Sequence, residues 1–498
     1  MNQNTRPNIV LVFTDNQQAS TLGCYGNDEI QSPHLDNLAA NGIRFDKAFC
    51  PNSFCSPCRA STLTGLLPSQ HGVHSWIDDR KMAEWPSGWH ALDGLSTLPE
   101  ILSSNGYRTG LFGKYHLGTP TKPAPGWDNW VTMEDGHVRS FYHNKIFDNG
   151  KVYSHEGATV DFFTEKAIEF MGQSESQPFF AYLPYPSPYG HWPATAEDGV
   201  HRFSDLYDDC PMNSIPRCGL SPEAVRGYRM IDAGSTKGLD FSMILRAPND
   251  LKTLRNYYAQ ITLIDDCVGQ MVTQLEEQGQ LDNTLFIFTA DHGLSLGHHG
   301  FWGHGGATFP SNLHLATHSI PLIFSQPGRI QAKQVSDLHT SNLDIFATIL
   351  DYLDIEHPSR NDPLNTSRSL AGVLQGEPIS DWGEDEVYSE QEETRVLRTP
   401  QWVYFRRFKG HPEEDLSDAL YDVQNDPQET INLIDQPEYA SVAKELTARI
   451  DRFFDQYAFQ EADLWRGGRP IQNVIWSDFW QQTWGKHWRP VYQYPHDS

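Results

Sequence analysis

A continuous apolar run near the N-terminus, Asn8–Thr14, limits strongly how this chain can fold. Its residues do not alternate between apolar and polar, so the strand that they predict must be buried on both faces. Further strands are expected at 108–112, 178–185, 284–289 and 320–325, and helices at 98–104, 158–172, 249–278 and 342–353. This alternation predicts an α/β fold whose large, mostly parallel central sheet is flanked by helices.

The character of the chain changes twice after the first strands. Residues 186–248 lack clear periodicity and are rich in Gly, Pro, Asp and Ser, which is typical of a long functional loop. Beyond about residue 381, short alternating segments predict a small antiparallel sheet, and 439–457 predict a helix packed on it. We therefore expect a main α/β domain over 1–380 and a C-terminal α+β subdomain with a tail over 381–498.

The aromatic tail, 466–498, has three interpretations. It covers an active site, forms a subunit contact in a homo-oligomer, or packs on the surface. Seven cysteines without regular spacing do not indicate a disulfide framework.

The charge of the chain limits its partners. The 37 Lys and Arg residues face 64 Asp and Glu, which gives a formal net charge of −27 at pH 7. Such acidity argues against nucleic acid and against anionic membranes as partners. No stretch is long and apolar enough to span a bilayer, and the first eight residues do not resemble a leader. A cytoplasmic protein is expected, or a periplasmic or secreted one if a leader has been removed.

Acidic residues directly follow two of the predicted central strands. Asp15 and Asn16 follow the first strand, and Asp291 and His292 follow the strand at 284–289. Ligands bind outside the carboxyl ends of parallel strands, so these side chains predict a binding site at one sheet edge. Oxygen ligands suit Ca²⁺ or Mg²⁺, and a histidine also admits Mn²⁺ or Zn²⁺. For a single Asp, a helix cap or a loop hydrogen bond is the alternative.

The segment Cys55–Arg59 brings a thiol, a proline and an arginine together at a predicted helix start. Ser56 is the expected N-cap and Pro57 the first helical residue, which leaves Cys55 just ahead of the helix. There the helix dipole favours an anion or a thiolate. The planar guanidinium of Arg59, with its several N–H donors, suits a tetrahedral oxyanion. The segment predicts a nucleophile, or its precursor, that faces an anionic group.

This segment resembles the sulfatase family, whose members carry Cys-x-Pro-x-Arg followed by Thr-Gly. The pattern is matched by Cys55, Pro57 and Arg59 and by Thr64-Gly65, whereas the position after Pro, most often Ser in the family, holds Cys58. The resemblance implies that a maturation enzyme oxidises Cys55 to formylglycine, whose hydrate attacks a sulfate ester. It also implies an alkaline-phosphatase-like fold.

The resemblance extends to the metal site. It implies that Asp15, Asn16, Asp291, His292 and the residue derived from Cys55 hold the ion. Calcium is the expected ion, with Mn²⁺, Mg²⁺ or Zn²⁺ as alternatives.

Three further segments resemble family motifs that bind substrate. Gly113–Gly118 is similar to Gly-Lys-Trp-His-Leu-Gly and offers Lys114 and His116. The segment 189–193 offers His191, and His304 occupies the place of the usual substrate lysine. By this resemblance Arg59 and Lys114 offset developing charge, and His116 is the base that releases sulfate. His191 and His304 contact the sulfate or protonate the leaving oxygen.

These observations predict a sulfuric ester hydrolase that acts on a small-molecule or oligosaccharide sulfate ester, either a sulfated carbohydrate or an aryl or alkyl sulfate. A phosphonate monoester or phosphodiester hydrolase is the alternative within the superfamily, because such enzymes share the Asp-His pair. A third interpretation is a non-catalytic module: Cys55 and Cys58 fit a redox pair, and with His71 and His74 they loosely mimic zinc-finger spacing.

Overall fold

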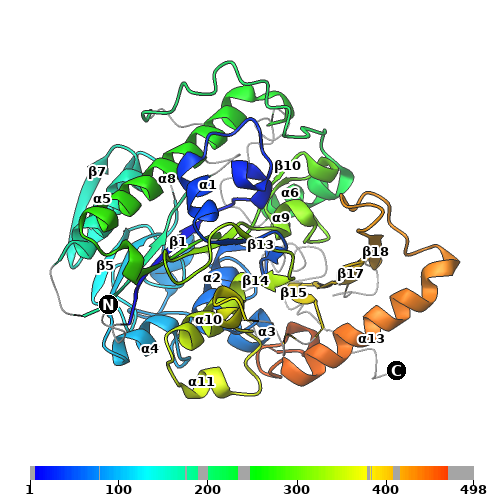
Figure 1. Ribbon diagram of the computed structural model, residues 1–498. Helices are drawn as coiled ribbons and strands as arrows, with labels where there is room; N and C mark the ends of the chain where they lie inside the picture. Colours follow the sequence, from blue (N-terminus) through cyan, green and yellow to red (C-terminus); the bar gives the residue numbers. More distant parts are fainter. Residues whose placement is uncertain are drawn as a thin grey trace.

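The computed structural model describes residues 6–77, 79–138, 140–173, 177–188, 200–233, 247–377, 382, 384–407 and 416–468. A ten-stranded sheet in the order β13-β2-β12-β9-β1-β8-β4-β5-β6-β7 forms the centre (Figure 1). Its strands are β1 Asn8–Thr14, β2 Ile43–Phe45, β4 Arg108–Gly113, β5 Asn129–Met133, β6 His143–Asp148, β7 Lys151–Glu156, β8 Phe179–Pro184, β9 Thr284–Ala290, β12 Leu322–Ser325 and β13 Gln334–Ser336. The predicted α/β class is confirmed.

The five strands in the middle of the sheet, β9, β1, β8, β4 and β5, run parallel. On β1, Val12 pairs with Leu183 on one side and with Phe288 on the other. Beyond them β12 pairs antiparallel with β9, and β6 pairs antiparallel with both β5 and β7. The sheet is therefore mixed, and the expected parallel arrangement is that of its middle.

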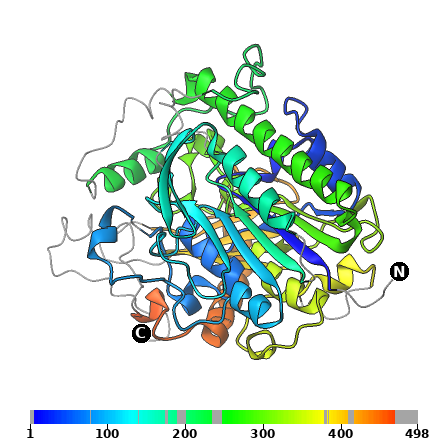
Figure 2. The same ribbon diagram turned by 90° about the vertical axis from the view of Figure 1, so that its left-hand side faces the viewer.

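The side chains of β1 show why helices must pack on both faces of the sheet. Val10 and Val12 enter one core with the first set of helices, α1 Pro33–Ala40, α5 Thr159–Met171 and α8 Leu251–Glu277. Ile9, Leu11 and Phe13 enter the opposite core with α2 Cys55–Thr64, α4 Leu98–Ser104 and α10 Ile345–Tyr352. Figure 2 shows these helices on the two sides of the sheet. The uninterrupted apolar run from Ile9 to Phe13 in β1 follows from this double burial.

The segment expected to be irregular, 186–248, contains the helix α6 Pro222–Ala233. That part of the expectation is wrong. Ala224 and Tyr228 of α6 pack against Phe301 and Ala307, which explains the helix as a product of tertiary packing.

A second, four-stranded antiparallel sheet follows in the C-terminal part (right side of Figure 1). Its strands are β15 Val387–Gln391, β16 Thr394–Arg398, β17 Trp402–Arg407 and β18 Ala419–Asp422. The helix α13 Ala440–Tyr457 covers one face, where Leu446, Ile450 and Phe454 pack against Leu397 and Tyr404.

The remaining short elements complete the main part of the chain. They are β3 Ala48–Phe49, α3 Pro68–His71, β10 Ser295–Leu296, β11 Trp302–Gly303, α9 Leu315–His318, β14 Thr340–Ser341, α11 Pro358–Asn361 and α12 Ala371–Leu374. In the part of the chain that the structure describes, no helix has the length and apolarity that crossing a membrane requires.

Candidate active site

The ends of β1 and β9 bring two carboxylates together. The two strands are neighbours and finish level, with Thr14 paired to Ala290. The Asp291 N–H donates to the Thr14 carbonyl at 2.9 Å, and the Asn16 N–H donates to Asp291 Oδ1 at 3.1 Å. Asp15 and Asp291 are both fully buried. Two residues that each follow a strand are thus held at one edge of the sheet.

The helix α2 delivers Cys55 to these carboxylates. The Cys55 Sγ lies 3.5 Å from Asp15 Oδ1 and 3.4 Å from His292 Nε2. The possible ligand atoms of Asp15, Cys55, Asp291 and His292 all lie within 4.8 Å of one another. Residues far apart in sequence therefore form one compact, buried group.

The start of α2 differs from the prediction. Cys55 is the first helical residue and Phe54 precedes it, so Ser56 is not the N-cap. The Ser56 hydroxyl instead donates to the His116 carbonyl at 2.9 Å and accepts the Ile77 N–H at 3.0 Å. It therefore connects α2 to two loops of the site, and this tertiary use overrides the local capping preference.

Burial determines the state of the Cys55 sulfur. Desolvation raises the pKa of the Cys55 thiol well above its ordinary value, and the nearby Asp15 raises it further. In this buried position the thiol form of Cys55 is favoured over the thiolate that the helix start alone would favour. A protonated thiol is a poor nucleophile, which agrees with the role of a precursor.

Two cations balance the carboxylates. Arg59 Nη2 donates to Asp15 Oδ2 at 3.1 Å and to Asp291 Oδ2 at 2.9 Å, and its Nη1 donates to the Lys114 carbonyl at 2.7 Å. The Lys114 ammonium forms an ion pair with Asp15. Burial alone would raise the pKa of Asp15, but Lys114 and Arg59 outweigh it and hold this pKa well below its usual range. Asp15 is thereby kept ionised and able to bind a cation.

The donor set fits a divalent cation. The Asn16 side chain donates to Asp15 through its nitrogen, while Asn16 Oδ1 is buried and has no hydrogen-bond partner among the described residues. His292 Nδ1 lies 2.8 Å from the Gly293 carbonyl, which fixes the tautomer and leaves Nε2 as the metal-binding nitrogen. Carboxylate and amide oxygens with one imidazole can hold Ca²⁺, Mg²⁺, Mn²⁺ or Zn²⁺.

His116 has the chemistry of a general base. Its Nε2 lies 3.0 Å from the Ile77 carbonyl, so Nε2 carries the hydrogen of the neutral ring. Its Nδ1 is buried and lacks a hydrogen-bond partner in the described part of the chain. Burial and the charge of Lys114 hold the pKa of His116 well below its ordinary value. The ring therefore presents a free lone pair at neutral pH.

His304 lies beside the metal-site residues. Its ring centroid is 5.7 Å from that of His292 and 4.9 Å from that of Phe54. The Gly306 N–H donates to His304 Nδ1 at 3.2 Å, so Nε2 carries the hydrogen of the neutral ring. The neutral ring of His304 can thus donate a hydrogen bond through Nε2. His191 lies outside the described residues.

Sequence reasoning missed His137, in the loop between β5 and β6. Its ring centroid lies 4.8 Å from that of His116 and 6.1 Å from that of Trp76. The strand ahead of it, Asn129–Met133, is short and mixes polar with apolar residues, so its carboxyl end was not recognised. A histidine just after a parallel strand is the signal that could have revealed it.

The interpretation as a zinc module is wrong, because its four residues do not converge. The Cys58 thiol donates to the Asp291 carbonyl at 2.6 Å and accepts from Asn342 at 3.0 Å. His71 bonds Ser61, and His74 lies 2.7 Å from the Ala462 carbonyl. Cys58, His71 and His74 all lie outside the metal-ligand group found among the described residues.

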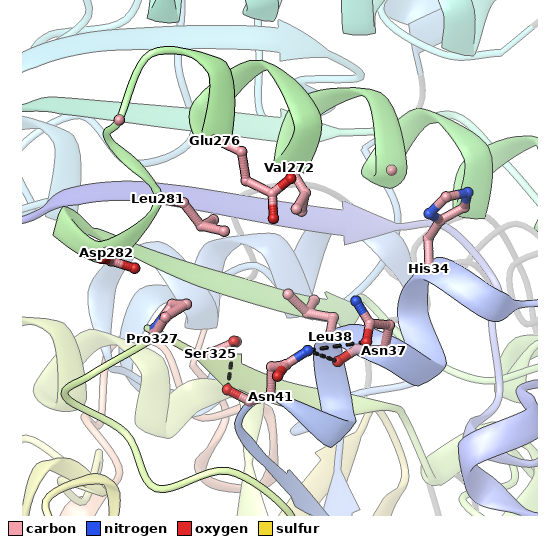
Figure 3. Close-up of a pocket in the computed structure, with 12 residues that line it drawn as sticks. His34, Asn37, Leu38, Asn41, Val272, Glu276, Leu281, Asp282, Ser325 and Pro327 are labelled. Carbon is pink, nitrogen blue, oxygen red and sulfur yellow. Dashed lines mark hydrogen bonds between the residues drawn. The ribbon is translucent and has the colours of Figure 1, made fainter.

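A cavity of about 380 Å³ lies elsewhere in the molecule (Figure 3). It is bounded by α1, the end of α8 and β12, with polar side chains such as Asn37, Glu276 and Asp282. Asp282 lies just before the first residue of β9, whereas Asp291 follows the last one, so this cavity lies at the opposite end of the strand from Asp291. It is distinct from the metal-ligand group.

Two family models match this chain. The model described as sulfatase matches residues 7–355, and the model described as N-sulphoglucosamine sulphohydrolase, C-terminal, matches residues 312–456. Together they cover both sheets.

Individual proteins show the same similarity. The N-acetylglucosamine-6-O-sulfatase of Bacteroides thetaiotaomicron is 26% identical over 94% of this chain and 90% of its own length. The Homo sapiens N-sulphoglucosamine sulphohydrolase is 27% identical over 90% of each protein. A structure solved in complex with its substrate D-glucosamine-2-N,6-O-disulfate is 25% identical, with a TM-score of 0.71 over 91% of this chain and 98% of the other.

Proposed function

The chain belongs to the sulfatase family and is a sulfuric ester hydrolase, and from this premise we propose that it removes sulfate from a sulfated amino sugar of the glucosamine type. The names of the relatives support this substrate class, since two of them act on glucosamine derivatives. The geometry that supports cleavage of a sulfate ester is the group formed by Asp15, Cys55, Asp291 and His292, whose ligand atoms lie within 4.8 Å of one another.

The proposed machinery uses a formylglycine derived from Cys55 and a divalent cation, for which we propose Ca²⁺. Asp15, Asn16, Asp291 and His292 would hold the ion, which supplies Lewis-acid polarisation of an ester oxygen. Arg59 keeps the two carboxylates in place through its bonds to both of them. Lys114 adds a positive charge beside the same group, where negative charge develops on the sulfate oxygens.

Proton transfers are assigned to two histidines. Cleavage breaks the bond between sulfur and the ester oxygen, and the departing oxygen must gain a proton. His304 Nε2–H is the proposed hydrogen-bond donor to this oxygen, and the proton would come from the cationic form of the His304 ring, since a neutral imidazole is too weak an acid. The attack on sulfur would leave sulfate bound to one oxygen of the hydrated aldehyde at position 55. Its release requires a base that removes the proton of the other hydroxyl group. His116 Nδ1, with its lone pair unused among the described residues, is the proposed acceptor.

One experiment tests the reaction and the nucleophile together. Released sulfate is measured with glucosamine 6-sulfate for the wild type, Cys55→Ala and Cys58→Ser. Cys55→Ala should abolish turnover, whereas Cys58→Ser, a change in the same helix to the usual family residue, should keep it. Mass spectrometry of the peptide that contains Cys55 should show the loss expected when a thiol becomes an aldehyde. Full activity of Cys55→Ala would contradict the proposal.

A phosphonate monoester hydrolase is the second candidate, favoured by the Asp291-His292 pair. Both ester classes should be assayed on one preparation of the wild type. Faster turnover of a phosphonate monoester than of every sulfate ester tested would replace the first proposal by the second.

A further inference from the structure

His137 lies next to the proposed base but has no task in the proposed reaction. It stands four residues after β5, whose parallel neighbour β4 leads directly to Lys114 and His116. Its ring meets His116 edge-on, at an interplanar angle of 75°. Trp76 lies against both rings, 6.4 Å from His116 and 6.1 Å from His137. These three side chains form one aromatic wall of the site.

The two ring nitrogens of His137 have different roles. Nδ1 lies 3.1 Å from the Val138 carbonyl, and a carbonyl only accepts, so Nδ1 carries the hydrogen. Nε2 of the neutral ring is then a hydrogen-bond acceptor. It has no hydrogen-bond partner among the described residues, and the residue keeps 9% of its surface exposed. Burial and the charge of Lys114 lower the pKa of His137 to about 3, so the ring is neutral at physiological pH.

An acceptor in this position selects for a donor on the ligand. A sulfate group is only an acceptor, so it cannot bond to the unprotonated Nε2 of His137. Sugar hydroxyl and N–H groups can donate to it, whereas the ring of an aryl sulfate offers no such hydrogen. The acceptor therefore matches the alcohol part of the substrate.

We propose that His137 Nε2 accepts a hydrogen bond from a hydroxyl or N–H group of the sugar and thereby makes the site prefer carbohydrate sulfates over aryl sulfates. This inference rests on the proposed function, whose substrate it specifies further. His137 is thus a specificity-determining residue for the sugar. The sulfate group itself is bound by Arg59, Lys114 and the metal site.

Two substitutions separate the ring nitrogens. His137→Asn keeps a side-chain N–H at the place of Nδ1, where it can still donate to Val138, but removes Nε2. His137→Gln places a polar atom near Nε2 and restores an acceptor. Both are compared in a Cys55→Ala background, where binding is measured without turnover and does not depend on conversion of Cys55. The probes are glucosamine 6-sulfate and 4-nitrophenyl sulfate.

The expected result is a difference between the probes. His137→Asn should weaken binding of glucosamine 6-sulfate by about tenfold, because the sugar donor loses its partner, and should change binding of 4-nitrophenyl sulfate less than about twofold. His137→Gln should recover most of the lost affinity for the sugar. The same pattern should appear in kcat/KM when Cys55 is intact.

Two results would overturn the inference. An equal loss for both probes would mean that His137 acts by positioning His116 or the loop, and no loss for either would mean that it does not meet the substrate. Failure of the proposed reaction is recognised separately, because a wild type that cleaves no sulfate ester leaves the binding comparison in the Cys55→Ala background readable.

Discussion

Arg59 balances the charges of two buried carboxylates. Its guanidinium bonds both Asp15 and Asp291, and all three side chains are buried. Such a group gives little net stability when intact, but the loss of one partner leaves charges uncompensated in a poorly solvated site.

We expect Arg59→Ala to lower the free energy of unfolding by about 3–5 kcal/mol in chelated samples, since Asp15 and Asp291 then repel each other. Saturating Ca²⁺ should restore part of this loss, because the ion replaces the missing positive charge. Urea unfolding with EDTA and with Ca²⁺ measures both values. Unchanged stability in EDTA would show that the two carboxylates do not depend on Arg59.

At the scale of elements, the helix α2 depends on how it ends. Gly65 follows it with a φ of +71°, a conformation that side chains disfavour. A Cβ at this position would lie 2.7 Å from Phe346 Cδ1 and 2.8 Å from Ser367 Oγ. The glycine thus allows α2 to stop against α10 while its first residue stays beside Asp15.

Gly65→Ala should therefore destabilise the protein by about 2–4 kcal/mol through backbone strain and overpacking. Gly94→Ala is the matched control, because Gly94 has a similar φ of +89° with no atom within 4 Å of the added Cβ. It should cost only about 1–2 kcal/mol. Thermal unfolding of the two variants compares them, and equal losses would mean that the contact with Phe346 is harmless.

Glu429 connects the C-terminal sheet to the loop ahead of α9. It pairs with Arg398 of β16 at 2.7 Å and with His314 at 3.0 Å. Burial alone would raise the pKa of Glu429, but Arg398 and His314 lower it from 4.5 to about 2. A carboxyl whose pKa is lower in the folded state adds stability above the unfolded pKa and loses it as pH falls.

Glu429→Gln should for this reason cost about 3 kcal/mol near neutral pH. Its stability should also fall less steeply than that of the wild type between pH 4.5 and about 2, where the wild-type carboxylate becomes protonated. Chemical unfolding at several pH values measures this slope. Parallel curves for the two proteins would contradict the assignment.

Elements buried on both faces could be predicted closely from sequence. The strand β9, Thr284–Ala290, is wholly buried and apolar except for two threonines, and its ends were located to within one residue. The edge strand β7 and its neighbour β6 were missed. β7, Lys151–Glu156, is almost fully exposed and carries a mixed pattern. Edge strands have too little burial to produce an apolar signal.

The active site also combines residues that local sequence patterns predict with contacts that they do not. Asp15 and Asp291 are recognisable because each directly follows a buried strand. Contacts between distant segments are not visible in local patterns: Gln391, the last residue of β15, accepts the Ser53 N–H at 3.1 Å across 338 residues. His137 was missed for a similar reason, since only the folded loop brings it to His116.

At the scale of the whole molecule, an anionic substrate must approach a strongly anionic protein. The formal charge is −27, whereas the cations Arg59 and Lys114 lie buried at the bottom of the site. Repulsion at long range slows the approach and is screened by salt, while the buried charges are screened much less.

We therefore expect kcat/KM for a monosulfated sugar to rise by about two- to fivefold between roughly 10 and 150 mM NaCl. Turnover at saturating substrate should stay nearly constant. Initial rates across this range measure both quantities. A series at the same pH, in which an uncharged solute replaces NaCl, serves as the control. A steady fall of kcat/KM with salt would mean that local attraction exceeds the overall repulsion.

The burial of Cys55, which is 3% exposed, has a consequence for how the protein is made. The thiol is enclosed by residues that the ribosome adds much later, including Asp291 and His292, about 240 positions downstream. At typical elongation rates this delay lasts roughly 10–50 s. An enzyme that oxidises position 55 must therefore act before the chain has folded around it, and the time of synthesis alone leaves the thiol accessible for at least this interval.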